Sequence, residues 1–297
     1  MKLSILIVNY NTEELTLQAI DSILKNVSTI DYEIIVIDNN SRKTTLDKVL
    51  LNNPYNDKVK FIGLEKNIGF GKANNKGFEI ANGEYVFLLN SDAYLIDDSI
   101  IRLIDFMDEK KNKKVACCGP NLINSKGEPN LSYGNFLSRE KLLYDLGLKK
   151  IDQQILIEEL AISKICDFSE VKEVDYLSGA ALMIRKSVID KFGMFNPKYF
   201  MYYEDMDLCF KYFSNGYKSV LVPDVTFVHI GGQSWTSNEI SSYEAFKIVA
   251  KSKYIFSKNI LNSLEASLFY IFDYFKYFKQ YFKRIVIKVL NRQKSGN

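Results

Sequence analysis

Three acidic residues lie close together in the stretch YFMYYEDMDLCFKYF, which runs from residue 199 to residue 213. Glu204, Asp205 and Asp207 are surrounded there by tyrosine and phenylalanine. A carboxylate beside large apolar groups loses hydration, which is costly unless it is paired, binds a metal or takes part in chemistry. The structural alternative is the first turn of a helix, where acids interact favourably with the helix dipole. This stretch alone leaves both interpretations open.

A second group of residues that could take part in chemistry combines Asp92 with His229, the one histidine of the chain. His229 follows the apolar run VTFV and precedes IGG, where the glycines allow a backbone to approach an anion. Carboxylate oxygens with one imidazole suit Mn²⁺ or Mg²⁺, and such a cation most often serves phosphates. A lone histidine is also common as a hydrogen-bonded core residue, so a structural role stays open as well.

The first third of the chain alternates predicted strands and helices that could position these residues. LSILIV (3–8) and YEIIVID (32–38) are short apolar runs, typical of strands buried on both faces. Between them, TEELTLQAIDSILKN has helical spacing of its apolar residues, with Thr12 as the expected N-cap. VKFIGL and GEYVFLLNSDA (83–93) continue the strands, and GFGKANNKGFEIA predicts a loop entering a helix. Such alternation predicts βαβ units and a mostly parallel central sheet flanked by helices, an α/β fold.

Polar residues follow the predicted strands in VNYNT, VIDNNS, LLNSDA, YYEDMD and HIGG. Ligands of open α/β sheets bind outside the carboxyl ends of the strands. Any one of Asp38, Asp92 or Asp205 could be an ordinary turn or cap residue. Several at the same edge predict a binding site, so residues from 38 to 229 are expected to converge on one cleft.

The remainder of the chain divides into a less regular middle and a helical end. Residues 125–173 are expected to be irregular or insertional, with helices through LLYDLGLKK and QQILIEELAISK. VDYLSGAALMIRKSVI predicts a turn, a strand and a helix start, and YKSVLVPDVTFVHIGG two short strands. We therefore expect one domain over residues 1–237 and a helical extension over 238–297.

The helical extension is basic and rich in aromatic residues. Residues 260–297 carry seven lysines and arginines against two acids, and their apolar residues recur at helical spacing. This pattern predicts a helix lying in the interface of an anionic membrane. The alternative is a terminal helix docked on the core or on a second subunit, so a homo-oligomer also stays open.

Composition limits the function classes. The hydrophobic share of 47% and net charge of +3 are ordinary for a globular protein and do not suggest a nucleic-acid binder. Four cysteines without CxxC spacing predict reduced thiols and a cytoplasmic location. We find no secretory signal pattern and no apolar run of about 18 residues that would span a bilayer.

Several nucleotide-using and hydrolytic classes do not fit. VNYNTEE has no glycine for a dinucleotide-binding loop, and GFGKAN departs from GxGxxG at Asn74. A P-loop and a GxSxG elbow are absent. A nucleotidyltransferase would need a glycine- and arginine-rich first loop, which VNYNTEE is not.

In six segments the sequence resembles glycosyltransferase family 2, the inverting nucleotide-sugar transferases with a GT-A fold, and more narrowly its rhamnosyltransferase-like bacterial members. The segments follow the family's order over residues 3 to 235: SILIVNYNT, VIDNNS, NIGFGKANNKGFEIANGEYVFLLNSDA, VDYLSGAALMIRKSVIDKFGMF, YFMYYEDMDLCFKYFSNGY and VPDVTFVHIGGQS.

The resemblance implies a role for each candidate residue. Val8, Asn9 and Tyr10 would cradle the nucleoside of the donor, and Asp38 would accept a base N–H. Asn90, Ser91 and Asp92 stand at the Asp-x-Asp-type motif, where Asp92 and His229 would hold Mn²⁺ or Mg²⁺, with Gly231 and Gly232 nearby. Asp205 would be the general base, Glu204 and Trp235 would contact the acceptor, and Asp207 would brace the helix.

The departures from the family pattern also carry information. Asn90 replaces the first acid of Asp-x-Asp, which weakens the expected metal site. Trp235 follows Ser234 instead of completing the QxxRW signature of processive members, so transfer of one or a few sugars is expected. The implied partners are a nucleotide-diphosphate sugar, a lipid-linked or saccharide acceptor and the inner face of the cell membrane. The rival hypothesis is a non-catalytic sugar-nucleotide-binding or scaffold protein of the same fold.

Overall fold

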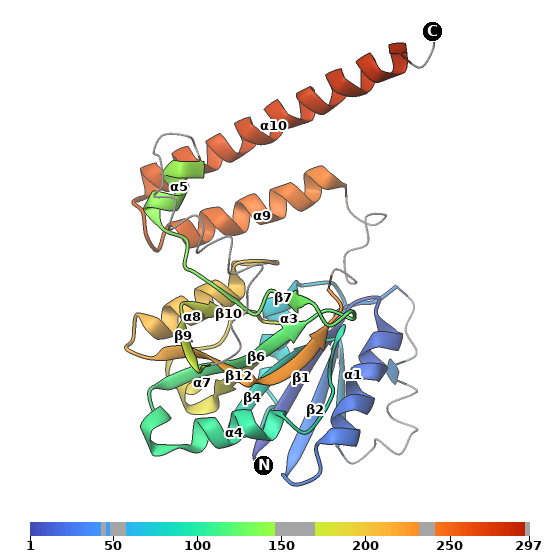
Figure 1. The fold of residues 1–297 in the computed structure, drawn as a ribbon, viewed down its shortest axis with the longest axis vertical. Coiled ribbons are helices and arrows are strands. Elements are labelled where there is room, and N and C mark those ends of the chain that lie inside the picture. The colour runs from blue at the N-terminus through green and yellow to red at the C-terminus, as the bar shows by residue number, and fades with distance from the viewer. Residues whose placement is uncertain (43–45, 48–57, 146–169, 232–240, 295–297) are drawn as a thin grey trace. The chain divides into compact units, whose positions relative to one another are not determined.

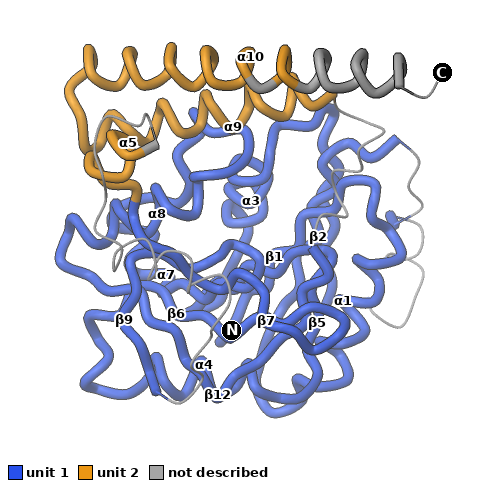
Figure 2. The backbone as a smooth tube through the Cα atoms, turned by 45° about the horizontal axis from the view of Figure 1, so that its top comes forward, with its two compact units in different colours: residues 1–136, 152–239 blue, residues 137–151, 240–297 orange. Residues whose placement is uncertain are grey.

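The computed structural model describes residues 1–42, 46–47, 58–145, 170–231 and 241–294 (Figure 1). The chain divides into two compact units, which Figure 2 shows in different colours. Unit 1 comprises residues 1–136 and 152–239, and unit 2 comprises residues 137–151 and 240–297. The helix predicted through QQILIEELAISK lies outside the described residues.

Unit 1 is built on a mixed ten-stranded sheet and a separate two-stranded one. Its strands are β1 (Leu3–Asn9), β2 (Tyr32–Asp38), β3 (Val59–Gly63), β4 (Tyr85–Asn90), β5 (Ala93–Leu95), β6 (Val115–Ile123), β7 (Pro129–Asn130), β8 (Tyr133–Gly134), β9 (Lys172–Val174), β10 (Tyr176–Leu177), β11 (Ala181–Arg185) and β12 (Lys218–His229). The main sheet has the order β3-β2-β1-β4-β11-β6-β12-β5, with β7 on β6 and β9 on β12, and β10 pairs with β8. β3, β2, β1 and β4 are parallel to one another, as β6 is to β12, whereas β11 runs antiparallel between β4 and β6.

Helices cover both faces of this sheet, which explains why its central strands are mostly apolar. The helices of unit 1 are α1 (Glu13–Asn26), α3 (Phe70–Phe78), α4 (Ile100–Asp108), α7 (Lys186–Phe192) and α8 (Glu204–Phe213), with a 3₁₀ turn at Lys110–Asn112. Along β1, Ile5 packs in a cluster with residues of α1 and α4, and the next residue, Leu6, packs in a second cluster with residues of α3, α7 and α8. Alternate side chains of a strand point to opposite faces, so each needs an apolar neighbour.

The strand register brings the polar strand ends together at one edge. Asn9 is paired with Asp38 across β1 and β2, and Val8 with Asn90 across β1 and β4. β12 reaches the same region from the far side of the sheet, because its antiparallel pairing with β5 places His229 opposite Ala93. The convergence expected from the sequence is therefore produced largely by sheet register.

Some elements differ from the sequence-based expectation. YKSVLVPDVTFVHIGG forms one strand, β12, instead of two, with a register irregularity between Val222 and Thr226. Pro223 has no backbone N–H to donate to a ladder, so the pairing with β6 is interrupted there and then resumes. Thr12 does precede α1 but makes no side-chain cap, because its hydroxyl bonds Asn9 and Ser91 instead.

Unit 2 consists of α5 (Arg139–Asp145), α9 (Ser242–Ser257) and α10 (Ser263–Lys294). Ser241 caps α9 by accepting a hydrogen bond from the Glu244 backbone N–H at 3.2 Å. α9 and α10 pack through aromatic rings, the tightest pair being Phe246 and Tyr277, stacked with centroids 4.2 Å apart. Within the described part of the chain, no helix is both long and apolar enough to cross a membrane.

Candidate active site

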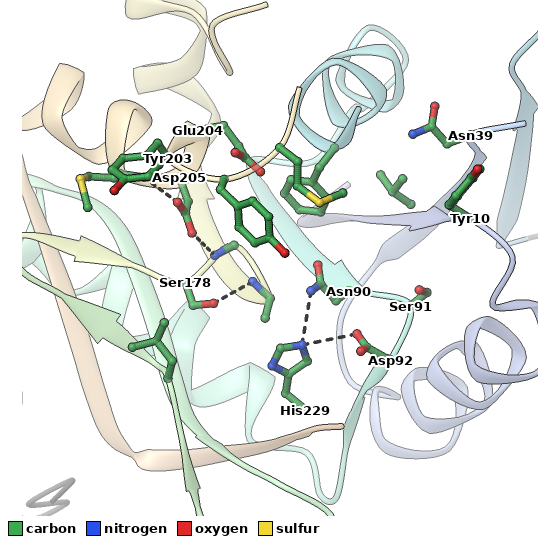
Figure 3. Close-up of a pocket in the computed structure, with 18 of the residues that line it drawn as sticks. Tyr10, Asn39, Asn90, Ser91, Asp92, Ser178, Tyr203, Glu204, Asp205 and His229 are labelled. Carbon is green, nitrogen blue, oxygen red and sulfur yellow. Dashed lines mark hydrogen bonds and ion pairs between the residues drawn. The ribbon is translucent and has the colours of Figure 1, made fainter. Parts of the chain in front are cut away.

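A cavity of about 490 Å³ opens at the polar edge of the sheet in unit 1 (Figure 3). Its lining includes Val8, Tyr10, Asn39, Asn67, Phe70, Asn90, Ser91, Asp92, Leu131, Tyr176, Ser178, Gly179, Ala180, Met201, Tyr202, Tyr203, Glu204, Asp205, Met206 and His229. Figure 3 shows Glu204 and Asp205 on one side of this cavity, Asp92 and His229 on another, and Tyr10 and Asn39 on a third. The acidic stretch and the Asp92–His229 pair thus belong to one site.

A strained turn delivers the acids to the cavity. Tyr202 and Tyr203 both have φ of 66°, in the left-handed region that bulky residues rarely occupy. Each such residue costs about 1–2 kcal/mol. The turn leads directly into α8, so that Glu204 and Asp205 are its first two residues. Strain of this kind persists only where surrounding contacts over-determine it, and such positions cluster at functional sites.

Asp205 is held by backbone donors from two elements. Its Oδ1 accepts a hydrogen bond from the Met206 N–H at 2.8 Å, and its Oδ2 accepts one from the Gly179 N–H at 3.2 Å. Burial raises the pKa of the Asp205 carboxyl above its usual range, although these two backbone donors act in the opposite direction. A carboxylate that is oriented, poorly hydrated and more basic than usual can accept a proton from a weak acid such as a hydroxyl.

Glu204 differs from its neighbour in having one carboxyl oxygen that accepts no hydrogen bond. It is only 5% exposed, and its Oε2 is buried without a hydrogen-bond partner. Burial and the negative charge of Asp205 raise the pKa of Glu204 to about 8. At neutral pH the Glu204 carboxyl is therefore mainly protonated and can donate a hydrogen bond within the cavity.

Asp207, the third acid, does not line the cavity. It lies one turn into α8 and accepts a hydrogen bond from the buried Tyr199 hydroxyl at 3.0 Å. Because Tyr199 precedes the strained turn, this bond ties the turn to the helix. Asp207 therefore braces the helix, as the sequence predicted.

Asn90, Asp92 and His229 form a second polar group. The Nε2 of His229 lies 3.4 Å from Asp92 Oδ1 and 3.4 Å from Asn90 Nδ2. Asn90 Oδ1 and His229 Nδ1 are both buried without hydrogen-bond partners. Unsatisfied buried polar atoms are rare in folded proteins, and two in one corner of a cavity indicate groups that a ligand completes.

This corner of the cavity suits a divalent cation whose remaining coordination positions are filled by a bound ligand. A carboxylate oxygen and an imidazole nitrogen 3.4 Å apart are close enough to bind one ion. No cluster of three acidic, histidine or cysteine ligands exists among the described residues. Remaining coordination positions would then fall to oxygens of a diphosphate and to water, the usual arrangement for Mg²⁺ and Mn²⁺ at nucleotide sites.

The remaining nucleotide-site candidates divide into two groups. Val8, Tyr10 and Ser91 line the cavity. Asn9 and Asp38 do not: Asn9 donates to Asp38 Oδ1 at 2.6 Å and accepts from Thr12 and Thr16. Asp38 also accepts from the Ser41 hydroxyl at 2.5 Å and the Ser41 N–H at 3.1 Å. Asn9 and Asp38 thus fix the loops that follow β1 and β2, and their contact with a nucleoside stays a prediction.

Two predicted residues, Gly232 and Trp235, lie outside the described residues. Gly231 lies at the end of the described segment with φ of 78°, a conformation that glycine adopts without strain.

Other lining residues were not singled out from the sequence. Asn39 and Asn67 bond each other at 3.0 Å, and Asn39 Oδ1 accepts from the Ile68 N–H, which shapes the entry to α3. Gly179 and Tyr176 come from the segment that holds Asp205. The sequence could have indicated Asn39 and Asn67, because they are polar residues within the segments VIDNNS and NIGFG. No local pattern indicated Tyr176.

Comparison with known proteins identifies the family of the chain. The family model described as "Glycosyl transferase family 2" matches residues 4–193, more than half of the chain. A poly(ribitol-phosphate) beta-glucosyltransferase of Bacillus spizizenii is 28% identical over 197 residues, 63% of this chain but only 30% of that protein. The dTDP-rhamnosyl transferase RfbF of Shigella flexneri is 27% identical over 232 residues, covering 77% of this chain and 69% of its relative.

Solved structures share the fold. GalNAc-T7, crystallised with UDP, GalNAc and Mn²⁺, matches with a TM-score of 0.60 at 18% identity, over 86% of this chain and 50% of that one. The fold is therefore the GT-A fold, with a mostly parallel sheet, flanking helices and a helical C-terminal region, as the sequence predicted.

Proposed function

The chain belongs to glycosyl transferase family 2, and we propose that it transfers a sugar from a nucleotide-diphosphate donor to a hydroxyl group of a saccharide or lipid-linked acceptor, with inversion, during synthesis of a bacterial cell-surface polysaccharide. Rhamnose is the sugar that the resemblance favours. We assign catalysis to a domain over residues 1–237 and attachment to the membrane to residues 238–297.

The observation that carries this proposal is the meeting of two chemical groups in one cavity. Asp205, with a raised pKa and fixed orientation, and the Asp92–His229 pair both line it. A protein that only binds a sugar nucleotide has no use for a desolvated base opposite a phosphate site. Sugar transfer needs both, because a hydroxyl must lose a proton while a diphosphate leaves.

In the proposed reaction, Asp205 accepts the proton of the acceptor hydroxyl as its oxygen attacks the anomeric carbon. The bond from that carbon to the diphosphate breaks on the opposite face, which inverts the configuration. Glu204, protonated at neutral pH, donates a hydrogen bond that orients a sugar hydroxyl. Val8, Tyr10 and Ser91 contact the donor, and Asp38 orients the nucleoside through the loop that it holds.

Asp92 and His229 would hold the divalent cation, Mn²⁺ or Mg²⁺, which supplies positive charge for the leaving diphosphate. Asn90 leaves this site one carboxylate short of the Asp-x-Asp pattern. The donor phosphates therefore contribute a larger share of the coordination, and the cation binds together with the nucleotide.

Replacing Asp205 with asparagine tests the base. Asp205→Asn keeps the shape of the side chain but cannot accept the proton, so transfer should fall by about 10²–10⁴-fold. Donor binding, followed by the shift in melting temperature on adding nucleotide sugar with Mn²⁺, should be retained. Asp207→Asn on the same helix is the matched control and should keep most activity, because Asp207 contacts Tyr199 instead of the cavity. Near-normal transfer by Asp205→Asn would refute the assignment.

We also place the enzyme at the inner face of the cell membrane, bound through residues 260–297. The support is the excess of seven basic residues over two acids in this segment, since clustered basic residues are attracted to the anionic inner leaflet.

A further inference from the structure

Helix α10 separates two kinds of large side chain onto different faces. Tyrosines contact α9: Tyr277 stacks on Phe246 at 4.2 Å, Tyr274 meets Phe246 at 5.0 Å, and Tyr270 meets Tyr254 at 4.9 Å between ring centroids. These three tyrosines follow one another at spacings of four and three residues, so they form one face of the helix. The α9–α10 pair is therefore held mainly by tyrosines of α10, and Phe278 adds a contact with Tyr243 of α9 at 6.0 Å between ring centroids.

A second face of α10 carries aliphatic and phenylalanine side chains that are exposed. We call it the outer stripe; its members are Leu264 (71% exposed), Leu268 (51%), Ile271 (63%), Phe275 (64%), Phe278 (41%) and Phe282 (63%). The spacing alternates between four and three residues, which keeps them on one side over about five turns. An exposed apolar strip of this length is unusual on a protein surface and marks an interaction site.

The charges beside the outer stripe favour one kind of partner. Lys276, Lys279 and Lys283 each directly follow a stripe residue and so lie along one edge of it. The two acids of α10 do not neutralise them, because Glu265 bonds Arg139 at 2.9 Å and Asp273 bonds Lys253 at 3.1 Å, both within unit 2. The surface is thus apolar along its centre and positive along one edge.

We propose that the outer stripe is the surface through which unit 2 lies on an anionic lipid bilayer, with α10 in the plane of the interface. This rests on the proposed function for its location at a membrane and adds the contact face. Phenylalanine, leucine and isoleucine would enter the acyl boundary while the lysines meet acidic headgroups. The tyrosine face stays on α9, so the helix pair binds as a preformed unit.

A second copy of the chain fits the stripe less well. Two copies packed stripe to stripe would bring exposed lysine edges into the same interface without acids to pair with them, and helix pairs of that kind are usually set by complementary charges. Acidic lipid headgroups satisfy the lysines and the apolar residues at the same time.

Vesicle binding by single variants tests the contact face. Phe275→Ser removes a stripe residue, and Phe213→Ser removes a phenylalanine of similar exposure (55%) in unit 1. With vesicles of equimolar phosphatidylcholine and phosphatidylglycerol, Phe275→Ser should weaken binding roughly tenfold or more, the loss expected for one phenylalanine leaving an apolar phase. Phe213→Ser should bind as the unchanged protein does, and vesicles of phosphatidylcholine alone should bind all three weakly.

The outcomes that overturn the inference are distinct from those that overturn the proposed function. Equal vesicle binding by Phe275→Ser and Phe213→Ser would show that the outer stripe is not the contact with the bilayer. If sedimentation instead showed that Phe275→Ser dissociates a dimer while vesicle binding is kept, that result would also show that the outer stripe is not the contact with the bilayer. Donor hydrolysis in solution reports on the cavity separately: Phe275→Ser should retain it, and Asp205→Asn should retain vesicle binding.

Discussion

Two adjacent carboxyl groups, Glu204 and Asp205, differ in their hydrogen-bond partners, although burial raises the pKa of both. Asp205 accepts hydrogen bonds from two backbone N–H groups, which stabilise its charged form. Glu204 Oε2 has no partner, and Glu204 feels both burial and the charge of Asp205. The sequence shows only that two acids are adjacent, so this division of roles could not be predicted from it.

The raised pKa of Glu204 predicts how stability depends on pH. The folded pKa of about 8 exceeds the ordinary 4.5, so the stabilising contribution of the bound proton is full below pH 4.5 and is lost as pH rises towards 8. The maximum loss for a shift of this size is roughly 5 kcal/mol. Glu204→Gln cannot ionise, so its free energy of unfolding should fall less over this range, and part of the fall will remain because the pKa of Asp205 is also raised.

Urea unfolding at several pH values measures this effect. Glu79→Gln, on the exposed end of α3 where Glu79 pairs with Lys76, is the control and should follow the unchanged protein within about 0.5 kcal/mol. If Glu204→Gln lost stability as steeply as the control between pH 4.5 and 8, the inference that Glu204 is protonated in the folded protein would be wrong.

At the scale of elements, the start of α3 depends on a close approach between two backbones. Gly69 has φ of 88°, and a Cβ there would lie 2.1 Å from the carbonyl oxygen of Phe200. The same oxygen accepts a hydrogen bond from the Phe70 N–H at 3.0 Å. Gly69 therefore lets α3 support the segment that leads into the strained Tyr202–Tyr203 turn and the acids at the start of α8.

Gly69→Ala should destabilise the protein by about 3 kcal/mol or more, because it adds backbone strain and a steric clash with a backbone atom. Gly127 separates these two causes: it has φ of 79° but nothing within 4 Å of a Cβ. Gly127→Ala should cost only the strain, about 1 kcal/mol. Thermal or denaturant unfolding compares the two variants; equal losses would show that the approach to Phe200 is not a constraint.

The order and type of the main elements could be predicted because they depend on local pattern. Apolar runs such as LSILIV and YEIIVID predicted strands, and helical spacing predicted α1. Pairings between distant segments could not be predicted in the same way. The three-residue strand β5 is too short to give a periodic signal, yet its pairing with β12 places His229 beside Asp92. The polar ends of the predicted strands indicated that Asp92 and His229 meet, but the pairing that brings them together could not be predicted from local pattern.

At the scale of the whole molecule, charge is distributed unevenly. The net charge of +3 hides a basic end: residues 260–297 hold seven lysines and arginines against two acids, so the remainder of the chain is slightly acidic. Among the described residues that line the cavity there is no lysine or arginine, whereas Asp92, Glu204 and Asp205 are all present. The excess of positive charge is thus carried by the segment proposed to meet lipid and not by the described residues that line the cavity.

This distribution predicts that a nucleoside diphosphate binds well only with a divalent cation. UDP alone would bring its negative charges beside Asp92 without a cationic side chain among the described lining residues, so UDP with EDTA should shift the melting temperature little. UDP with Mn²⁺ at about 100 times its dissociation constant should stabilise the fold by roughly 2.7 kcal/mol, a shift of several degrees. Asp92→Asn should remove most of the Mn²⁺-dependent part. Asp98→Asn, a 69%-exposed neighbour in sequence, should keep it. An equal shift with UDP in EDTA and in Mn²⁺ would show that the cavity neutralises the diphosphate by itself and that the Asp92–His229 pair serves another purpose.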